Sequence, residues 1–322
     1  MDPYDEVCTV PEELSRVERK REIFAGDPYF RDAWDDLRAV CGTGQAQLKQ
    51  LFRVAPLVLR PDAIATRGGA RVLEAVAAQG FIPVACETFR FDRHTTREVW
   101  RYQLNIATRE RIDVMDMIMP ATESLYVLLR DTTNSPIPAT TRLSSLKGPS
   151  RPEDRQTSHL RHIAGPAQAS VLTYLHVADE PADIVRELGI FFDSPQRNQL
   201  LGRLGSTEDA TVATLAELSR VESRTQSSDL CWRPALARLR QALDQAASPD
   251  RPRTELLSGL IDQVLVSRSK EWQAVLAQAD GLDLDWDFWD RVAVAAELSA
   301  RHLDAVPVLP DVGRTSWVTG RG

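Results

Sequence analysis

The sequence predicts an α+β protein whose core is a ferredoxin-like βαββαβ antiparallel sheet flanked by helical extensions. Between residues 53 and 193, short β-prone apolar runs and amphipathic stretches follow one another in the order β-α-β-α-β-loop-β-α. This order is not a Rossmann alternation and suits a split βαβ core with extra helices. We therefore expect three parts: a helical N-terminal extension (1–52), the core (53–193) and a helical C-terminal domain with an extended tail (194–322).

The N-terminal extension is expected to contain two helices. Residues 12–22 are rich in Glu, Arg and Lys, and residues 29–51 place apolar side chains at roughly helical spacing. Asp27-Pro28 lies between the two stretches and predicts a break there.

The central part opens with a buried strand, because the apolar run from Val54 to Leu59 is ended by Arg60-Pro61-Asp62. The other expected elements are a helix from Gly68-Gly69 to Gln79-Gly80, a strand over 81–91, a helix over 95–108, a strand over 125–129, a turn over 131–138, a polar loop over 147–156, a strand over 171–177 and a helix over 180–188.

The C-terminal part is expected to be helical. Its amphipathic stretches cover residues 212–221, 234–247, 255–266, 271–279 and 286–303. The last residues, from Pro307 to Gly322, hold two prolines and three glycines, which favours an extended tail.

Composition excludes several classes of protein. A net charge of -7 argues against a general role on nucleic acid or a membrane surface. No run of about 18 apolar residues predicts a transmembrane helix, and the acidic residues 1–6 do not resemble a signal peptide. We expect a cytoplasmic location. The four cysteines lie far apart, which favours free thiols in a reducing compartment.

His176 is the most informative residue. It lies near the end of the strand expected at 171–177, where it could present a ring nitrogen to a phosphate. Glu187, on the following helix, could hold the other nitrogen and fix the tautomer. A lone histidine on a strand is more often structural than catalytic, so the neighbouring residues decide the interpretation.

Those neighbours resemble the nucleoside diphosphate kinase family. The run Leu57 to Asp62 precedes a layout in which His176, Asp179, Glu187 and Phe191-Phe192 follow one another as in that family. The resemblance implies that His176 attacks the terminal phosphate of ATP, holds it, and passes it to an acceptor diphosphate. It also implies support of the site by Asp179, Mg²⁺ held chiefly by the nucleotide, and a homo-oligomer.

The resemblance further implies five residues that bind the nucleotide or its phosphates: Arg60, Tyr102, Arg142, Arg161 and Thr173. Arg60 takes the place of the lysine in the family's Lys-Pro-Asp motif. Arg142 and Arg161 fall near two family arginines, and Thr173 takes the place of an asparagine three residues before the histidine. Phosphoryl transfer depends mostly on positioning and charge neutralisation, which is why cations are expected here.

Two alternatives stay open. A catalytically degenerate nucleotide-binding or scaffold protein would fit the replaced lysine and asparagine, and the absence of an aromatic residue over 111–119 to stack on a base. The C-terminal helices could instead form a partner-binding module on a merely structural core, in which case His176 would be replaceable.

Other motifs are weaker. Five aspartates between Asp280 and Asp290 lack the glycine and glutamate of an EF-hand, so an acidic helix cap is the favoured interpretation. His159 and His162 are three residues apart and are interpreted as loop residues near phosphate. No Gly-x-Ser-x-Gly or Walker motif occurs.

Overall fold

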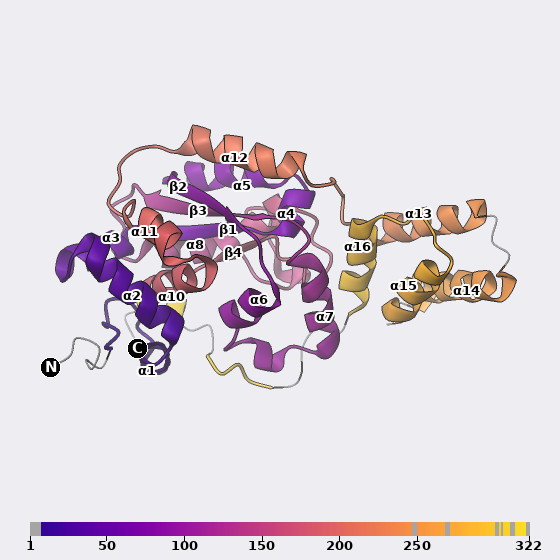
Figure 1. Ribbon diagram of the computed structural model, residues 1–322, viewed down its shortest axis with the longest axis horizontal. Helices are drawn as coiled ribbons and strands as arrows, with labels where there is room; N and C mark the ends of the chain where they lie inside the picture. The colour runs from indigo at the N-terminus through magenta and orange to yellow at the C-terminus, as the bar shows by residue number, and fades with distance from the viewer. Residues whose placement is uncertain are drawn as a thin grey trace.

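The computed structural model describes residues 8–246, 250–267, 271–299, 303, 305–309 and 313–319. It is a mixed α/β structure built on one four-stranded sheet with helices on both faces (Figure 1). Residues 1–6, on which the expectation about a signal peptide depends, lie outside this part of the chain. Within it, no helix is long and apolar enough to cross a membrane.

The sheet is antiparallel and has the strand order β2-β3-β1-β4. Its strands are β1 (Val54–Leu59), β2 (Phe81–Phe89), β3 (Ser124–Asp131) and β4 (Leu175–Val177). β1 lies between β3 and β4, and each of its residues is buried, as the continuous apolar run predicts. Val58 is paired with Tyr126 on one side and with His176 on the other, so these three side chains share one face. The predicted four-stranded antiparallel sheet is confirmed.

Helices cover both faces of this sheet. α5 (Gly69–Ala78) and α12 (Thr211–Ser223) lie over one face and α10 (Pro181–Phe191) lies over the other (Figure 1). The other helices of this region are α4 (Pro61–Ala65), α6 (Arg93–Val99), α7 (Arg109–Ile118), α8 (Ala139–Lys147), α9 (Leu160–Ala164) and α11 (Ser194–Leu201), with the 3₁₀ turns η2 (Leu104–Ile106) and η3 (Pro152–Asp154).

The N-terminal helices pack against α10. They are α1 (Glu18–Ala25), α2 (Pro28–Cys41) and α3 (Gln45–Phe52). Asp27 caps α2 by accepting hydrogen bonds from the backbone N–H groups of Tyr29 and Phe30, with Pro28 at the first helical position. The expected single helix over 29–51 is wrong, because Gly42 and Gly44 separate α2 from α3.

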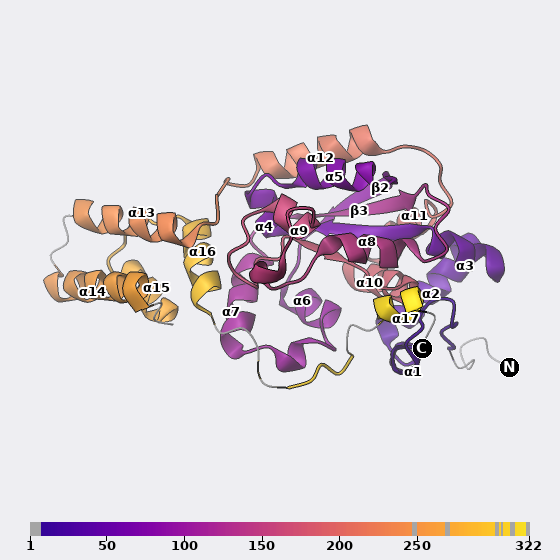
Figure 2. The ribbon, with the colours of Figure 1, turned by 180° about the vertical axis from the view of Figure 1, so that it is seen from behind.

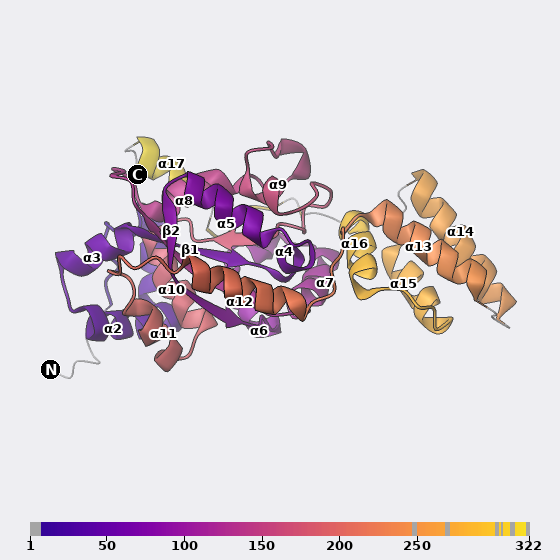
Figure 3. The ribbon, with the colours of Figure 1, turned by 90° about the horizontal axis from the view of Figure 1, so that it is seen from above.

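The C-terminal helices form a separate group beside the sheet, which contacts the rest of the molecule where α16 meets α7 (Figure 3). These helices are α13 (Trp232–Gln245), α14 (Arg251–Ser267), α15 (Trp272–Gly281) and α16 (Phe288–Leu298). The end expected at residue 247 lies outside the described chain, and the helix expected over 286–303 is α16, which ends at Leu298, so that Leu303 is not helical. The predicted extended tail is wrong in part, because it contains α17 (Gly313–Thr319).

Two further expectations are corrected in the core. The helix expected over 95–108 is α6 followed by η2, and the strand expected over 171–177 is reduced to β4. The sequence interpretation also missed α7 and α8, although the polar loop after Lys147 was expected.

A close approach of α10 to α2 gives a stability prediction. A Cβ atom on Gly189 would lie 2.1 Å from the carbonyl oxygen of Tyr29. Gly189→Ala should therefore lower the free energy of unfolding by about 1–3 kcal/mol, as overpacking usually does. Gly259→Ala is the matched control, since no atom lies within 4 Å of its added Cβ and alanine should stabilise α14 by about 0.5–1 kcal/mol. Urea unfolding of both variants checks this, and equal stabilities would contradict it.

Candidate functional site

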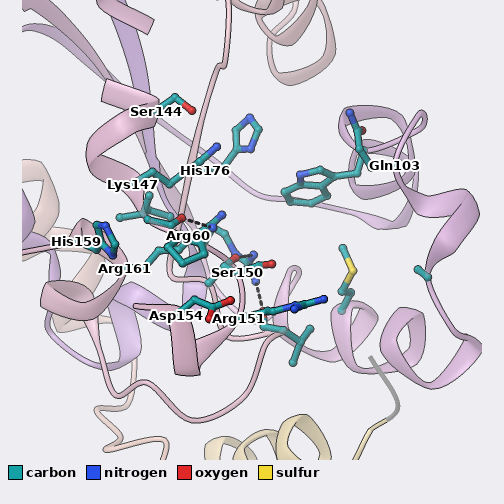
Figure 4. Close-up of a pocket in the computed structure, with 18 of the residues that line it drawn as sticks. Arg60, Gln103, Ser144, Lys147, Ser150, Arg151, Asp154, His159, Arg161 and His176 are labelled. Carbon is teal, nitrogen blue, oxygen red and sulfur yellow. Dashed lines mark hydrogen bonds between the residues drawn. The ribbon is translucent and has the colours of Figure 1, made fainter. Parts of the chain in front are cut away.

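A cavity of about 780 Å³ lies beside β4, between the α6–α7 segment and the α8–α9 segment (Figure 4). Its basic side chains and histidines are Arg60, Arg111, Lys147, Arg151, Arg161, His159 and His176. Its apolar wall contains Trp100, Leu104, Ile106, Ala107 and Met115. Asp154 is the carboxylate among the lining residues. Positive charge thus outweighs negative charge around the cavity, which favours an anionic ligand.

His176 faces this cavity from β4 and is held from behind by α10. Its Nε2 lies 2.7 Å from Oε1 of Glu187, and its side chain is 14% exposed. The tautomer that pairs with the carboxylate carries its proton on Nε2, so Nδ1 keeps the lone pair. Within the described chain Nδ1 has no hydrogen-bond partner. This tautomer therefore leaves on Nδ1 the lone pair that a nucleophile requires.

Trp100 packs against the same imidazole. Its ring lies edge-on to His176 at a centroid separation of 5.6 Å, and the Arg60 guanidinium lies 5.8 Å from the Trp100 centroid. Trp100 thus contacts both His176 and Arg60 and restricts rotation of the histidine ring.

A tight turn places His176. Tyr174 has φ of +63°, a left-handed conformation that costs energy for a bulky residue. Two contacts hold this turn: the Tyr174 N–H donates to Oδ2 of Asp62 at 2.8 Å, and the Tyr174 carbonyl accepts from Arg60 N–H at 2.9 Å. The Leu175 N–H also donates to the Thr173 carbonyl at 2.6 Å. The turn ends the preceding extended segment, which is why the strand is shorter than predicted.

Arg60 and Thr173 meet at the floor of the cavity. Arg60 is 4% exposed, donates to the Thr173 hydroxyl and to the Val171 carbonyl, and lies 3.2 Å from Oδ1 of Asp62. The structure therefore brings together His176, Glu187, Arg60 and Thr173, as the sequence interpretation expected.

Arg161 also lines the cavity, and its charge is poorly compensated. Its Nη1 donates to the Gly148 carbonyl at 2.7 Å, and in the described chain no carboxylate forms an ion pair with it. Burial, together with the charges of Arg155 and Arg60, lowers the pKa of Arg161 to about 9, although Asp179 and Asp62 oppose the change. A half-buried cation without an ion-pair partner favours a ligand that supplies negative charge.

Asp179 supports the site without lining the cavity. Its Oδ1 accepts from the Ser144 hydroxyl at 2.6 Å and from Lys147 Nζ at 2.9 Å. Burial disfavours the charged form, but Lys147, Ser144 and Lys20 together hold the pKa of Asp179 well below its usual range. Asp179 thus stays ionised and fixes Lys147, which Figure 4 shows on the same side of the cavity as Arg161.

Two expected residues lie elsewhere. The Tyr102 hydroxyl donates to Oδ2 of Asp27 at 3.0 Å, beside the Arg186 guanidinium. Arg142 lies in the first half of α8, away from Lys147 at its C-terminal end. Its Nη1 lies 2.5 Å from Oδ1 of Asp131. Neither side chain lines the cavity. Both side chains instead link elements of the fold.

The sequence interpretation missed Trp100 and Lys147 as site residues. Trp100 was placed on a continuous helix, whereas it follows the end of α6 and turns toward the cavity. The one available signal for Lys147 was its position three residues after Ser144, which places both on one helix face toward Asp179. His159 lines the cavity and His162 lines a smaller hollow of about 290 Å³.

The aspartates near α16 serve the fold. Asp287 caps α16 by accepting from Trp289 N–H, and Asp290 is paired with Arg238 at 2.6 Å, so the helix-cap interpretation is confirmed for Asp287. No group of three potential metal ligands occurs among the described residues.

Comparison with known proteins gives little guidance. No protein-family model matches the chain, and no curated protein matches it. Among solved structures, an orthorhombic crystal form of the Aquifex aeolicus nucleoside diphosphate kinase is similar, with 18% identity and a TM-score of 0.37. The match covers 44% of this chain and 95% of that chain.

Proposed function

We propose that the protein is a phosphotransferase in which His176 carries the terminal phosphate of ATP to a nucleoside diphosphate or a specialised acceptor. The observation that carries this proposal is the pairing of His176 Nε2 with Glu187, which leaves Nδ1 without a partner in the described chain on a side chain that lines a cationic cavity. A carboxylate behind an imidazole both fixes the tautomer and favours the positive ring formed on attack.

The proposed reaction has two displacements at phosphorus. The Nδ1 lone pair attacks the terminal phosphorus, the bond to the bridging oxygen breaks, and a diphosphate leaves with both electrons. The Glu187 carboxylate stabilises the positively charged ring. An oxygen of the acceptor then attacks the same phosphorus, and the nitrogen–phosphorus bond breaks to restore the neutral imidazole. Holding the reactants in line is the main task of the protein in such a reaction.

The cations of the cavity would neutralise the phosphates. Arg161 would gain from an anion, because it has no ion-pair partner in the described chain, and Lys147 is fixed in place by Asp179. Mg²⁺ would enter on the phosphates of the nucleotide, since the described residues offer no cage of three ligands. The metal would add positive charge to the transferred phosphate.

We further propose a ferredoxin-like core of the nucleoside diphosphate kinase kind. The support is the strand order β2-β3-β1-β4, with Arg60-Pro61-Asp62 at the end of β1 and His176 on β4. A homo-oligomer and a cytoplasmic location stay predictions.

One observation favours the second candidate, a nucleotide-binding protein without turnover. Arg60 is already paired with Asp62 and donates to Thr173. An arginine committed to these partners has less charge to offer a migrating phosphate than a free cation would have.

Incubation with γ-labelled ATP and Mg²⁺ tests the proposal. We expect the protein to gain an acid-labile, alkali-stable label that a diphosphate discharges, and His176→Ala to gain none. Absence of label on the wild-type protein would overturn the kinase proposal. Nucleotide binding measured by calorimetry in that case would support the second candidate.

A further inference from the structure

Described parts of the C-terminal segment contact both walls of the cavity. Here this segment is called the strap and comprises residues 303, 305–309 and 313–319 of the described chain. Figure 1 shows residues 305–309 beside the segment that joins α6 to α7, and Figure 2 shows α17 beside α8. The two ends of the strap therefore contact the two segments that form the cavity.

Backbone hydrogen bonds attach the first part of the strap to the α6–α7 wall. Leu303 N–H donates to the Ile106 carbonyl at 2.7 Å, and Leu309 N–H donates to the Tyr102 carbonyl at 3.2 Å. Between them, the Asn105 side chain binds the strap twice: Nδ2 donates to the Val306 carbonyl and Oδ1 accepts from Val308 N–H. The Asn105 amide thus fixes this part of the strap to the α6–α7 wall.

Trp317 attaches the other part of the strap at the opposite wall. Its indole N–H donates to Oε1 of Glu180 at 2.9 Å, and its ring lies against Arg16 and Phe52. Glu180 is fully buried and follows Asp179, the residue that fixes Lys147. Thr315, two residues before Trp317, lines the cavity that contains His176.

We propose that the strap is a specificity-determining wall that admits small phosphoryl acceptors to His176 and excludes water and bulky acceptors. The inference rests on the proposed function, because it concerns which acceptor reaches the phosphorylated histidine. A nitrogen–phosphorus bond is lost to water unless the site excludes it, so closing the cavity preserves the phosphate for the acceptor.

Glu180 keeps other hydrogen-bond donors when its contact with Trp317 in the strap is removed. Besides Trp317, its carboxylate accepts from the Ser15 hydroxyl, from Arg16 N–H and from Lys20 Nζ, which lies 2.9 Å away. Trp317→Ala therefore leaves this buried carboxylate bound by three donors, and it should release the strap without unfolding the core.

Two variants release the strap from opposite walls: Trp317→Ala and Asn105→Ala. Val318→Ala is the matched control, because Val318 lies on the same helix and is 63% exposed. The first readout is the rate at which diethyl pyrocarbonate modifies His176, followed by peptide mapping, which requires no phosphorylation. Both releasing variants should raise this rate by about tenfold, because each loses hydrogen bonding that holds the strap closed. Val318→Ala should leave the rate unchanged.

The second readout is the phosphorylated protein itself. Release of the strap should hasten hydrolysis of the label. It should also allow ADP coupled to a soluble polymer to accept the phosphate. The phosphorylated wild-type protein should transfer its phosphate well to free ADP and poorly to this polymer-coupled ADP. If the wild-type protein is labelled and the releasing variants match it in modification, hydrolysis and acceptor range, the strap proposal is overturned while the proposed function stands. If the wild-type protein is never labelled, the proposed function fails.

Discussion

Glu187→Gln is expected to slow phosphorylation of His176 by about 100-fold, within the range that a positioned acid or base contributes. The carboxylate accepts the Nε2 proton and stabilises the positive ring. An amide is neutral, and its NH₂ group can donate to Nε2, which moves the proton to Nδ1 and removes the attacking lone pair. The rate of labelling by γ-labelled ATP, under single-turnover conditions, measures the effect.

This loss should be separate from any loss of stability. Oε2 of Glu187 is buried and has no hydrogen-bond partner, so removing the charge relieves a desolvation cost. The melting temperature should therefore stay close to that of the wild-type protein. Glu74→Gln, an exposed change on α5, is the control and should label normally. Labelling of Glu187→Gln at the wild-type rate would show that the carboxylate has no part in the reaction.

Arg161→Met is expected to weaken the binding of tripolyphosphate by about 10- to 100-fold, the effect of losing a hydrogen bond between charged groups. Arg161 lines the cavity and lacks an ion-pair partner in the described chain. Arg151→Met removes an exposed cation from the same lining and should cost tenfold or less, because solvent screens it. Calorimetric titration of both variants compares them, and equal losses would contradict a special role for Arg161.

The pKa of about 9 for Arg161 gives this variant two further signatures. A base whose pKa is lowered on folding is destabilising while it is protonated, so at pH 7 its removal should not lower the melting temperature. In the wild-type protein, affinity for tripolyphosphate should fall as the pH rises through about 9, because the guanidinium loses its charge. Arg161→Met should lack that step.

The sheet was predictable because its signals are local. The run from Val54 to Leu59 is continuously apolar and ends at a proline, and these features alone mark a buried strand. β4 was overestimated because Asp62 binds the Tyr174 N–H across 112 residues of chain. α8 was missed because a Thr-Thr pair and a Ser-Ser pair interrupt its stronger helix formers, and threonine and serine favour helices less.

The candidate site was predictable only where its chemistry is fixed by a short motif. His176 and Glu187 are eleven residues apart, and a strand followed by a helix suffices to bring them together. Tyr102 instead binds Asp27, 75 residues earlier in the chain, and Arg142 is paired with Asp131 at the end of β3. The strap could not be foreseen, because its contacts join residues some 200 positions apart.

The position of the phosphate on the imidazole tests the central claim most directly. Two-dimensional ¹H–¹⁵N spectra of histidine-labelled protein, recorded after reaction with ATP, distinguish phosphate on Nδ1 from phosphate on Nε2. Because Glu187 occupies Nε2, we expect His176 to carry phosphate on Nδ1. Phosphate on Nε2 of His176, or on another residue, would contradict it.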